Sequence, residues 1–155
     1  MAHRFERSTM LNATPAAAFS LALDVDFHRE SFAETGEQIV GGVSSGSMVL
    51  GDTVTWRARH FGIWWTMTSK ISEYQEPSFF VDEQVKGPFK WFRHEHLFVA
   101  SGGGSGMTEM TDVVEFEAPL VPLGLIAERL VLRTHLEALI DLRNAQLKRA
   151  IEHNG

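Results

Sequence analysis

The sequence contains no cysteine and a single tyrosine. Without cysteine, disulfide bridges, thiol nucleophiles and cysteine-ligated zinc sites are all excluded. A chain that lacks a disulfide framework is also typical of a reducing compartment. The first residues, MAHRFERSTML, are polar and lack the apolar core of a signal peptide. We therefore expect a cytoplasmic protein.

Clustered positive charge is lacking as well. The formal net charge is -6, and the longest basic grouping is Lys148-Arg149. An acidic surface argues against nucleic acid and anionic membranes as partners. No apolar run approaches the roughly 20 residues that a membrane-spanning helix needs. We therefore expect neither nucleic-acid binding nor stable membrane insertion.

The overall composition is that of an ordinary globular protein. The chain has 155 residues, of which 44% are hydrophobic and 22% are charged. This length is close to that of one domain, and it allows a substantial core. We therefore treat residues 1–155 as a single domain.

The first third of the chain predicts one strand followed by two short helices. Residues 5–11 suit a strand. Thr14 is a good N-cap, and Pro15 fits the first helical position that follows it. Asp24 or Asp26 can cap a second helix, which Gly36 ends. From residue 37 the pattern changes to strands separated by glycine and proline, at residues 53–61, 64–74, 79–86, 89–100 and 107–117.

The C-terminal part predicts one long helix. From Leu123 the apolar residues recur at helical spacing for about thirty residues, so the helix would be about 45 Å long. Short connectors make the strands an antiparallel meander, and only this helix is large enough to cover its apolar face. The predicted fold is therefore α+β: a curved antiparallel sheet of about seven strands around a long C-terminal helix, with two short helices after the first strand.

Two stretches carry a resemblance to a known superfamily. They are VTWRARHFG at residues 54–62, and FFVDEQVKGPFKWFRHEHLF at residues 79–98 followed by TEMTDVVEFEAPLVPLG at residues 108–124. With the element order, they resemble the SRPBCC or START-like superfamily, which has the helix-grip fold of pollen-allergen-like proteins, and within it a bacterial cyclase-like branch. The resemblance implies an internal hydrophobic cavity. It does not imply one activity, because the fold hosts binders and enzymes alike.

Charged residues inside the strands are the most informative local feature. In residues 89–100 both sets of alternate positions mix polar and apolar side chains, and we favour the set with two histidines as the inward one. Arg93 and Glu95 would then form an exposed pair. On the neighbouring predicted strands, aspartate or histidine residues occupy the same set of alternate positions as the apolar side chains. The side chains expected to face one interior are Trp56, His60, Asp82, Phe92, His94, His96, Phe98, Met110 and Asp112.

An imidazole beside a carboxylate supports several chemical interpretations. His94 or His96 could form an acid/base pair with Asp112 or Asp82. The same polar groups could hold the head of a ligand, or brace the sheet as a structural network. The same histidines and carboxylates could also bind a divalent metal such as zinc or iron. His94-x-His96 places two imidazoles on one face of a strand, but no third ligand is known to converge on them, so we assign neither metal nor cofactor. The predicted ligand-binding residues are Phe27, Trp56, His60, Asp82, Phe92, Phe98, Met110 and Arg143.

These patterns support three functions. The first is binding of a small hydrophobic or aromatic molecule, such as a lipid, a quinone or a polyketide-like compound, in the cavity. The alternative is an enzyme of cyclase, dehydratase or isomerase type that uses the histidine and aspartate pair. A third is a regulatory interaction module, which would form a homodimer through Trp64-Trp65 or Phe61 on the outer face of the sheet.

Overall fold

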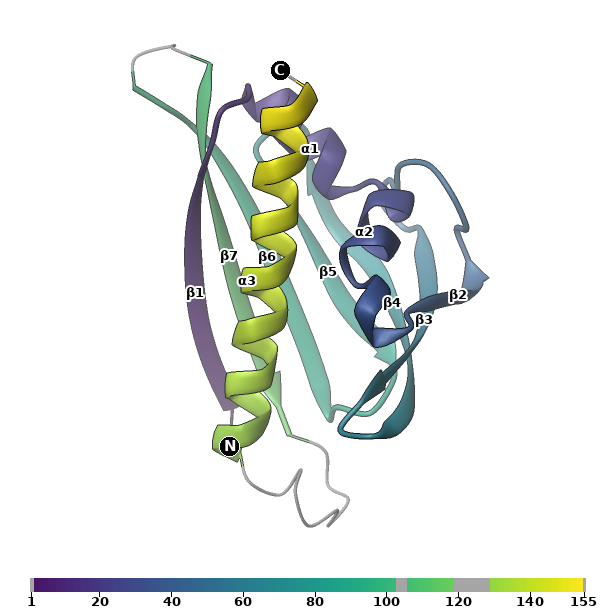
Figure 1. Cartoon of the computed structure of the whole chain (residues 1–155). Coiled ribbons are helices and arrows are strands. Elements are labelled where there is room, and N and C mark those ends of the chain that lie inside the picture. Colours follow the sequence, from purple (N-terminus) through teal and green to yellow (C-terminus); the bar gives the residue numbers. More distant parts are fainter. Residues whose placement is uncertain (1, 103–105, 119–128, 155) are drawn as a thin grey trace.

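A computed structural model describes residues 2–102, 106–118 and 129–154. Within them, seven antiparallel strands form one sheet in the order β1-β7-β6-β5-β4-β3-β2, and the sheet curves around a long C-terminal helix (Figure 1). The predicted fold class is confirmed. The elements are β1 (Ala2–Leu11), α1 (Pro15–Ala22), α2 (Val25–Ser31), the 3-10 helix η1 (Ala33–Thr35), β2 (Gln38–Gly42), β3 (Thr53–His60), β4 (Ile63–Gln75), β5 (Phe79–Lys86), β6 (Trp91–Ser101), β7 (Met107–Glu117) and α3 (Arg129–Asn154).

The two short helices begin where their capping residues predict. The Thr14 hydroxyl accepts a hydrogen bond from the Ala17 amide at 3.2 Å, and Pro15 opens α1. Asp24, and not Asp26, caps α2 by accepting from the Phe27 amide at 2.9 Å. These caps satisfy amide groups that have no partner within the helix.

Helix α3 runs along the concave face of the sheet, and α1 and α2 cover the part of that face beside it (Figure 1). Leu132 and Leu147, fifteen positions apart, are both buried, so the helix holds the sheet along much of its length. The predicted start of the helix at Leu123 lies outside the described residues. In the described part of the chain, no helix combines the length and hydropathy required to cross a bilayer.

The alternation of side chains along β3 and β6 is as predicted. On β3, Val54 and Ala58 are buried and share the inner face with Trp56 and His60. On β6, His94, His96 and Phe98 are buried. Arg93 and Glu95 lie on the opposite face and pair at 3.1 Å. The curved sheet therefore turns a mixed aromatic and histidine surface toward α3.

Two apolar clusters fill most of the interior. The first lies under α1, where the Phe19 ring makes edge contacts with the rings of Phe80 and Phe98, at 5.5 Å between centroids in each case. The second is built around Phe116 and Leu132. Residues from both clusters border a cavity, so the core is not packed solid between them.

Candidate functional site

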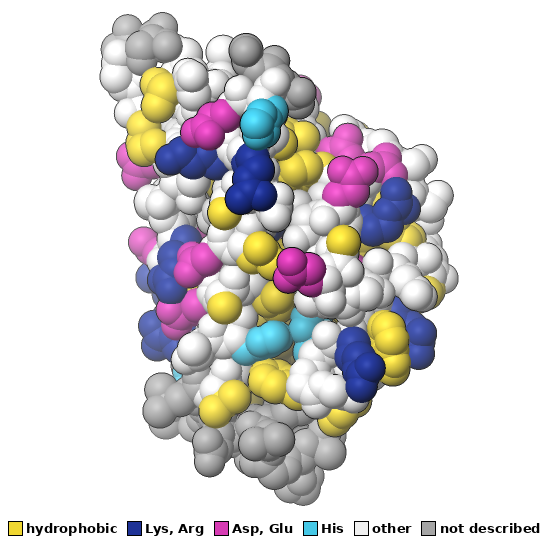
Figure 2. All heavy atoms as spheres, in the orientation of Figure 1, with side chains coloured by type: hydrophobic (Ala, Val, Ile, Leu, Met, Phe, Trp, Pro, Cys, Tyr) yellow, Lys and Arg dark blue, Asp and Glu magenta, His cyan; other side chains and the backbone are white. Residues whose placement is uncertain are grey.

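A cavity of about 260 Å³ lies between the concave face of the sheet, α2 and α3. Side chains of strands β3 to β7 form its floor, and histidine side chains are visible in the hollow beside α3 (Figure 2). The volume is slightly below the range of about 300–1,000 Å³ that is usual for ligand pockets. Most of the lining is apolar, and includes Val54, Ala58, Met67, Ile71, Leu136 and Ile140.

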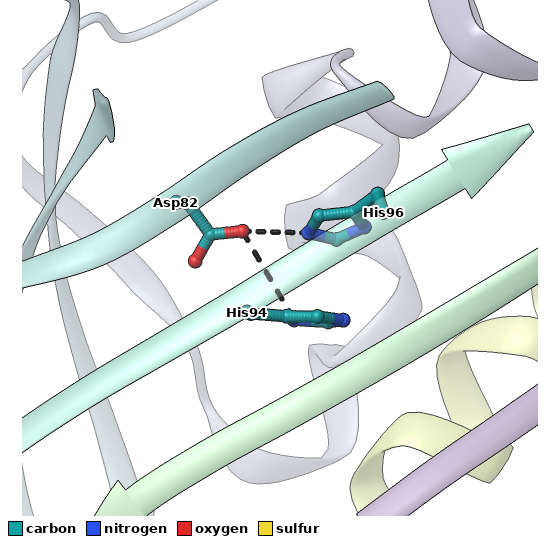
Figure 3. A group of neighbouring side chains, drawn as sticks. All are labelled: Asp82, His94 and His96. Carbon is teal, nitrogen blue, oxygen red and sulfur yellow. Dashed lines mark hydrogen bonds and ion pairs between the residues drawn. The ribbon is translucent and has the colours of Figure 1, made fainter. Parts of the chain in front are cut away.

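One wall of the cavity is polar and comes from two neighbouring strands. Asp82 on β5 pairs across the sheet with His94 on β6, and His96 lies two residues further along. The three side chains point toward one another (Figure 3): His96 Nε2 lies 2.6 Å from Asp82 Oδ2, and His94 Nδ1 lies 4.0 Å from the same oxygen. The two imidazole rings stack with centroids 3.7 Å apart. We call Asp82, His94 and His96 the polar wall.

A second layer of polar groups supports this wall from β7 and α3. His94 Nε2 lies 2.8 Å from Asp112 Oδ1, and Asp112 also accepts hydrogen bonds from Arg143 and from Asn144 Nδ2, the latter at 2.8 Å. Arg143 Nη1 lies 3.4 Å from His96 Nδ1. Because Arg143 can only donate, His96 Nδ1 accepts, and His96 Nε2–H donates to Asp82.

The environment sets the charge of His96 and of the two carboxylates at neutral pH. Burial, together with the neighbouring His94, lowers the pKa of His96 to about 4, so its ring is neutral. Burial raises the pKa of Asp82, but the hydrogen bond from His96 and the neighbouring histidines together outweigh it, so the net shift is downward. Burial also raises the pKa of Asp112, but the positive charge of Arg143 and the hydrogen bond from His94, with the other nearby histidine, together keep that pKa below its ordinary value. Both carboxylates are therefore ionised.

A second polar group lines the cavity away from the polar wall. His135 Nε2 on α3 lies 3.0 Å from His60 Nδ1 at the end of β3, and Phe61 packs against the His135 ring. Burial, and secondarily the neighbouring His135, lowers the pKa of His60 to about 4. Burial also lowers the pKa of His135. One imidazole must donate and the other accept, which two neutral rings can do.

A third polar contact lies at the edge of the cavity. His28 on α2 packs against the Trp56 ring, with centroids 4.4 Å apart and the rings tilted by 34°, and its Nε2 lies 3.0 Å from Glu37 Oε1. The side chain of His28 is 36% exposed, whereas that of Glu37 is 8% exposed. This contact packs α2 against the inner face of the sheet beside the cavity.

The predicted site residues divide into two groups. Trp56, His60, Asp82, Phe92, His94, His96 and Arg143 all line the cavity. Phe27, Phe98, Met110 and Asp112 do not: the first three pack in the apolar cluster under α1, and Asp112 is fully buried behind the histidines. The sequence predicted only that these side chains point inward. It could not separate the two groups, because α1 and α3 cover part of the inner face and the cavity lies over the rest. The binding and catalytic roles assigned to the residues that line the cavity stay predictions.

The outer-face surface expected for a homodimer is smaller than predicted. Trp65 lies opposite Ala58 in the β3–β4 pair and lines the cavity, while its indole donates to the His60 carbonyl at 3.0 Å. Phe61 follows the end of β3 with φ 55°, which breaks the strand alternation and turns its ring inward. Of the three residues only Trp64 remains largely exposed, at 43%. The homodimer itself, like the cytoplasmic location, stays a prediction.

Two histidines that line the cavity, His28 and His135, were not among the predicted site residues. A signal for His135 was present, since His135, Leu139 and Arg143 recur every four residues and so share one face of α3. No comparable signal marks His28, because its place depends on how α2 packs against Trp56.

Comparisons with solved structures identify the fold. The Zhui aromatase/cyclase from Streptomyces sp. R1128 has a TM-score of 0.73 at 14% identity, over 98% of this chain and 94% of that chain. A START superfamily protein from Mycobacterium smegmatis has a TM-score of 0.71 at 14% identity, over 99% of both chains. Ginseng major latex-like protein 151 from Panax ginseng has a TM-score of 0.65 at 13% identity, over 97% of both chains. At these identities the likeness shows the helix-grip fold alone.

Sequence comparison gives the family. Among curated proteins no sequence matches this one. The family model described as "Polyketide cyclase / dehydrase and lipid transport" matches residues 2–152, which is nearly the whole chain. Its description agrees with a fold built to hold a hydrophobic ligand, and with the superfamily that the strand motifs resemble. The chain therefore belongs to the polyketide cyclase/dehydrase and lipid transport family.

Proposed function

We propose that the protein binds a small, flat hydrophobic molecule with polar groups at both ends. The observation that carries this proposal is the cavity itself, which is about 260 Å³ in volume, mostly apolar, and lined by the polar wall and, separately, by the His60–His135 pair. The family description, which includes cyclases, dehydrases and lipid transport, supports a hydrophobic ligand.

The spacing of the polar groups indicates the length of the ligand. His135 and Arg143 both line the cavity from α3 and are eight residues apart, which corresponds to about 12 Å along the helix. His135 belongs to the pair with His60, and Arg143 contacts the polar wall. A molecule of two or three fused rings with an oxygen at each end fits this distance. We therefore favour an aromatic polyketide-like or quinone-like ligand over a long acyl chain.

A cavity-filling variant tests the proposal. Ala58 is buried and lines the cavity, so Ala58→Leu places three further carbon atoms where the ligand would lie. Thr66→Leu on β4 adds apolar bulk at an exposed position and serves as the matched control. We expect fused-ring phenols and quinones to raise the melting temperature of the wild type and of the control, but not that of Ala58→Leu. Calorimetric binding to Ala58→Leu with wild-type affinity would contradict the proposal, as would the absence of any stabilisation by such compounds.

A second candidate function is catalysis of the cyclase or dehydratase type. It is favoured by the contact between His96 and Asp82 at the cavity wall. His96 engages Asp82 Oδ2, and among the described residues no hydrogen bond engages Asp82 Oδ1. Asp82 Oδ1 is thus a carboxylate oxygen beside the ligand that could take a proton from a carbon next to a ligand carbonyl, forming an enolate.

Catalysis and binding are separated by one substitution. Asp82→Asn keeps the shape of the side chain but removes the base. If the protein is an enzyme, this variant retains ligand affinity within about 3-fold, while turnover of a β-keto or β-hydroxy ketone substrate falls by about 10²–10⁴-fold. Equal turnover by the wild type and the variant would reject this second function and leave the binding proposal standing.

A further inference from the structure

The polar wall brings together the kinds of ligand that a transition metal prefers. Asp82, His94 and His96 each offer one ligand atom, and the three atoms all lie within 4.8 Å of one another. From the sequence, no third ligand could be shown to converge on His94-x-His96. The pairing of β5 with β6 supplies it, because Asp82 faces His94 directly across the strands. We infer that Asp82, His94 and His96 form a binding site for a divalent transition metal such as Zn²⁺.

The distances between the ligand atoms are close to those of a metal site. Zinc bonds of 2.0–2.1 Å in tetrahedral geometry place neighbouring ligand atoms about 3.3 Å apart. The distance from His96 Nε2 to Asp82 Oδ2 is 2.6 Å, and that from His94 Nδ1 to the same oxygen is 4.0 Å. Each must change by less than about 1 Å. The two rings lie 25° from parallel and must turn to converge on one ion, a rotation about χ2 that is soft for histidine.

Asp112 is placed to support both histidine ligands from behind. Its Oδ1 lies 2.8 Å from His94 Nε2 and 3.5 Å from His96 Nδ1. Histidine ligands of metals commonly donate their second nitrogen to a carboxylate in this way. When a metal binds His96 Nε2, the proton on that nitrogen is lost and one is taken up on Nδ1, which then faces Asp112 and gives up its contact with Arg143 Nη1. The imidazole stays neutral and changes only its tautomer.

The charge around the site also favours a cation. Arg143 lies close to His96, but its charge is matched by its ion pair with Asp112. Asp82 therefore contributes one net negative charge to the group. Three protein ligands leave at least one coordination position open, and the cavity lies on that side because all three ligands line it. An oxygen atom of a cavity ligand could occupy that position.

Zinc titration of the wild type and matched variants tests the inference without any hydrophobic ligand. Protein stripped with a chelator is titrated with Zn²⁺ by calorimetry, and each variant is checked for folding by thermal unfolding. We expect one strong site per chain, weakened at least 100-fold by Asp82→Asn and by His94→Gln. His60→Gln, which changes a cavity histidine outside the polar wall, should bind zinc with wild-type affinity. A wild type without a strong site, or a site that survives both substitutions, overturns the inference.

A measurement on the wild type keeps the test independent of folding in the variants. Co²⁺ is added to the stripped protein, and its visible absorption and X-ray absorption fine structure are recorded. Intense bands of four-coordinate Co²⁺, with imidazole scattering and one or two oxygen neighbours, are expected. The weak spectrum of six-coordinate hydrated Co²⁺, without imidazole scattering, would overturn the assignment. Neither result depends on whether a hydrophobic ligand binds, so the test is separate from that of the proposed function.

Discussion

Asp112 on β7 and Arg143 on α3 form a buried ion pair, with 0% and 5% of their side-chain surface exposed. The pair joins the sheet to the helix that it grips. It also holds the two histidines of the polar wall from behind, since Asp112 contacts His94 and Arg143 contacts His96. A change in this pair should therefore affect both stability and the cavity.

The Asp112–Arg143 pair should show strong energetic coupling. Asp112→Asn leaves the Arg143 charge buried without a counter-charge, and we expect a loss of about 3–5 kcal/mol. Arg143→Gln should cost a similar amount, whereas the double variant should cost clearly less than the sum. The measurement is a double-mutant cycle by chemical denaturation. The exposed pair of Arg93 and Glu73, 2.7 Å apart, is the control, with an expected coupling below about 1 kcal/mol. Additive costs for the buried pair would contradict this prediction.

Two phenylalanines on the same face of β6 should have different roles. Phe92 lines the cavity, whereas Phe98 packs in the cluster under α1. We expect Phe92→Leu to weaken ligand binding about 10-fold with little change in the free energy of unfolding. Phe98→Leu should lower that free energy by about 1 kcal/mol and leave affinity unchanged. Melting curves and calorimetry on both variants check this, and the reverse pattern would show that the cavity is misplaced.

The His60–His135 pair should make stability depend on pH. His60 has a pKa of about 4 in the folded chain and about 6.5 when unfolded, so the unfolded state binds more protons between these values. The contribution to stability is therefore complete above about pH 6.5, and it is lost as the pH falls toward 4. Solvent screening at this half-buried site limits the loss from pH 7 to pH 5 to about 1 kcal/mol. Denaturation of wild type and His60→Gln at both values measures it, and an equally steep dependence in the variant would assign the effect to other groups.

Gly42 should tolerate substitution less well than Gly46. Both have positive φ, 74° and 76°, so an alanine is strained at either position. A Cβ on Gly42 would lie 2.2 Å from the Thr53 carbonyl oxygen, whereas one on Gly46 meets no atom within 4 Å. Gly46→Ala should therefore cost about 1 kcal/mol and Gly42→Ala clearly more, because the β2–β3 pairing must shift. Thermal unfolding of the two variants compares the costs, and equal melting temperatures would exclude the clash.

Local patterns predicted much of the fold because they depend on neighbours in the chain. Thr14 and Asp24 cap the helices that follow them, since a cap needs only the next few amides. The alternation along β3 correctly placed Trp56 and His60 on the inner face, because strand geometry repeats every two residues. The same reasoning was wrong for Phe61, where the strand ends and the backbone takes a positive φ.

The pattern of residues along the strands favoured an arrangement in which aromatic, histidine and aspartate side chains share one face of a sheet under a long helix. It could not determine which of them would meet. Asp82 lines the cavity and Asp112 is sealed behind it, although both lie inward on their strands. The difference comes from α3, which covers Asp112 with Arg143 and Asn144 and leaves Asp82 open. Strand register and helix packing join residues far apart in the chain, and a periodic pattern specifies the direction of a side chain but not its partner.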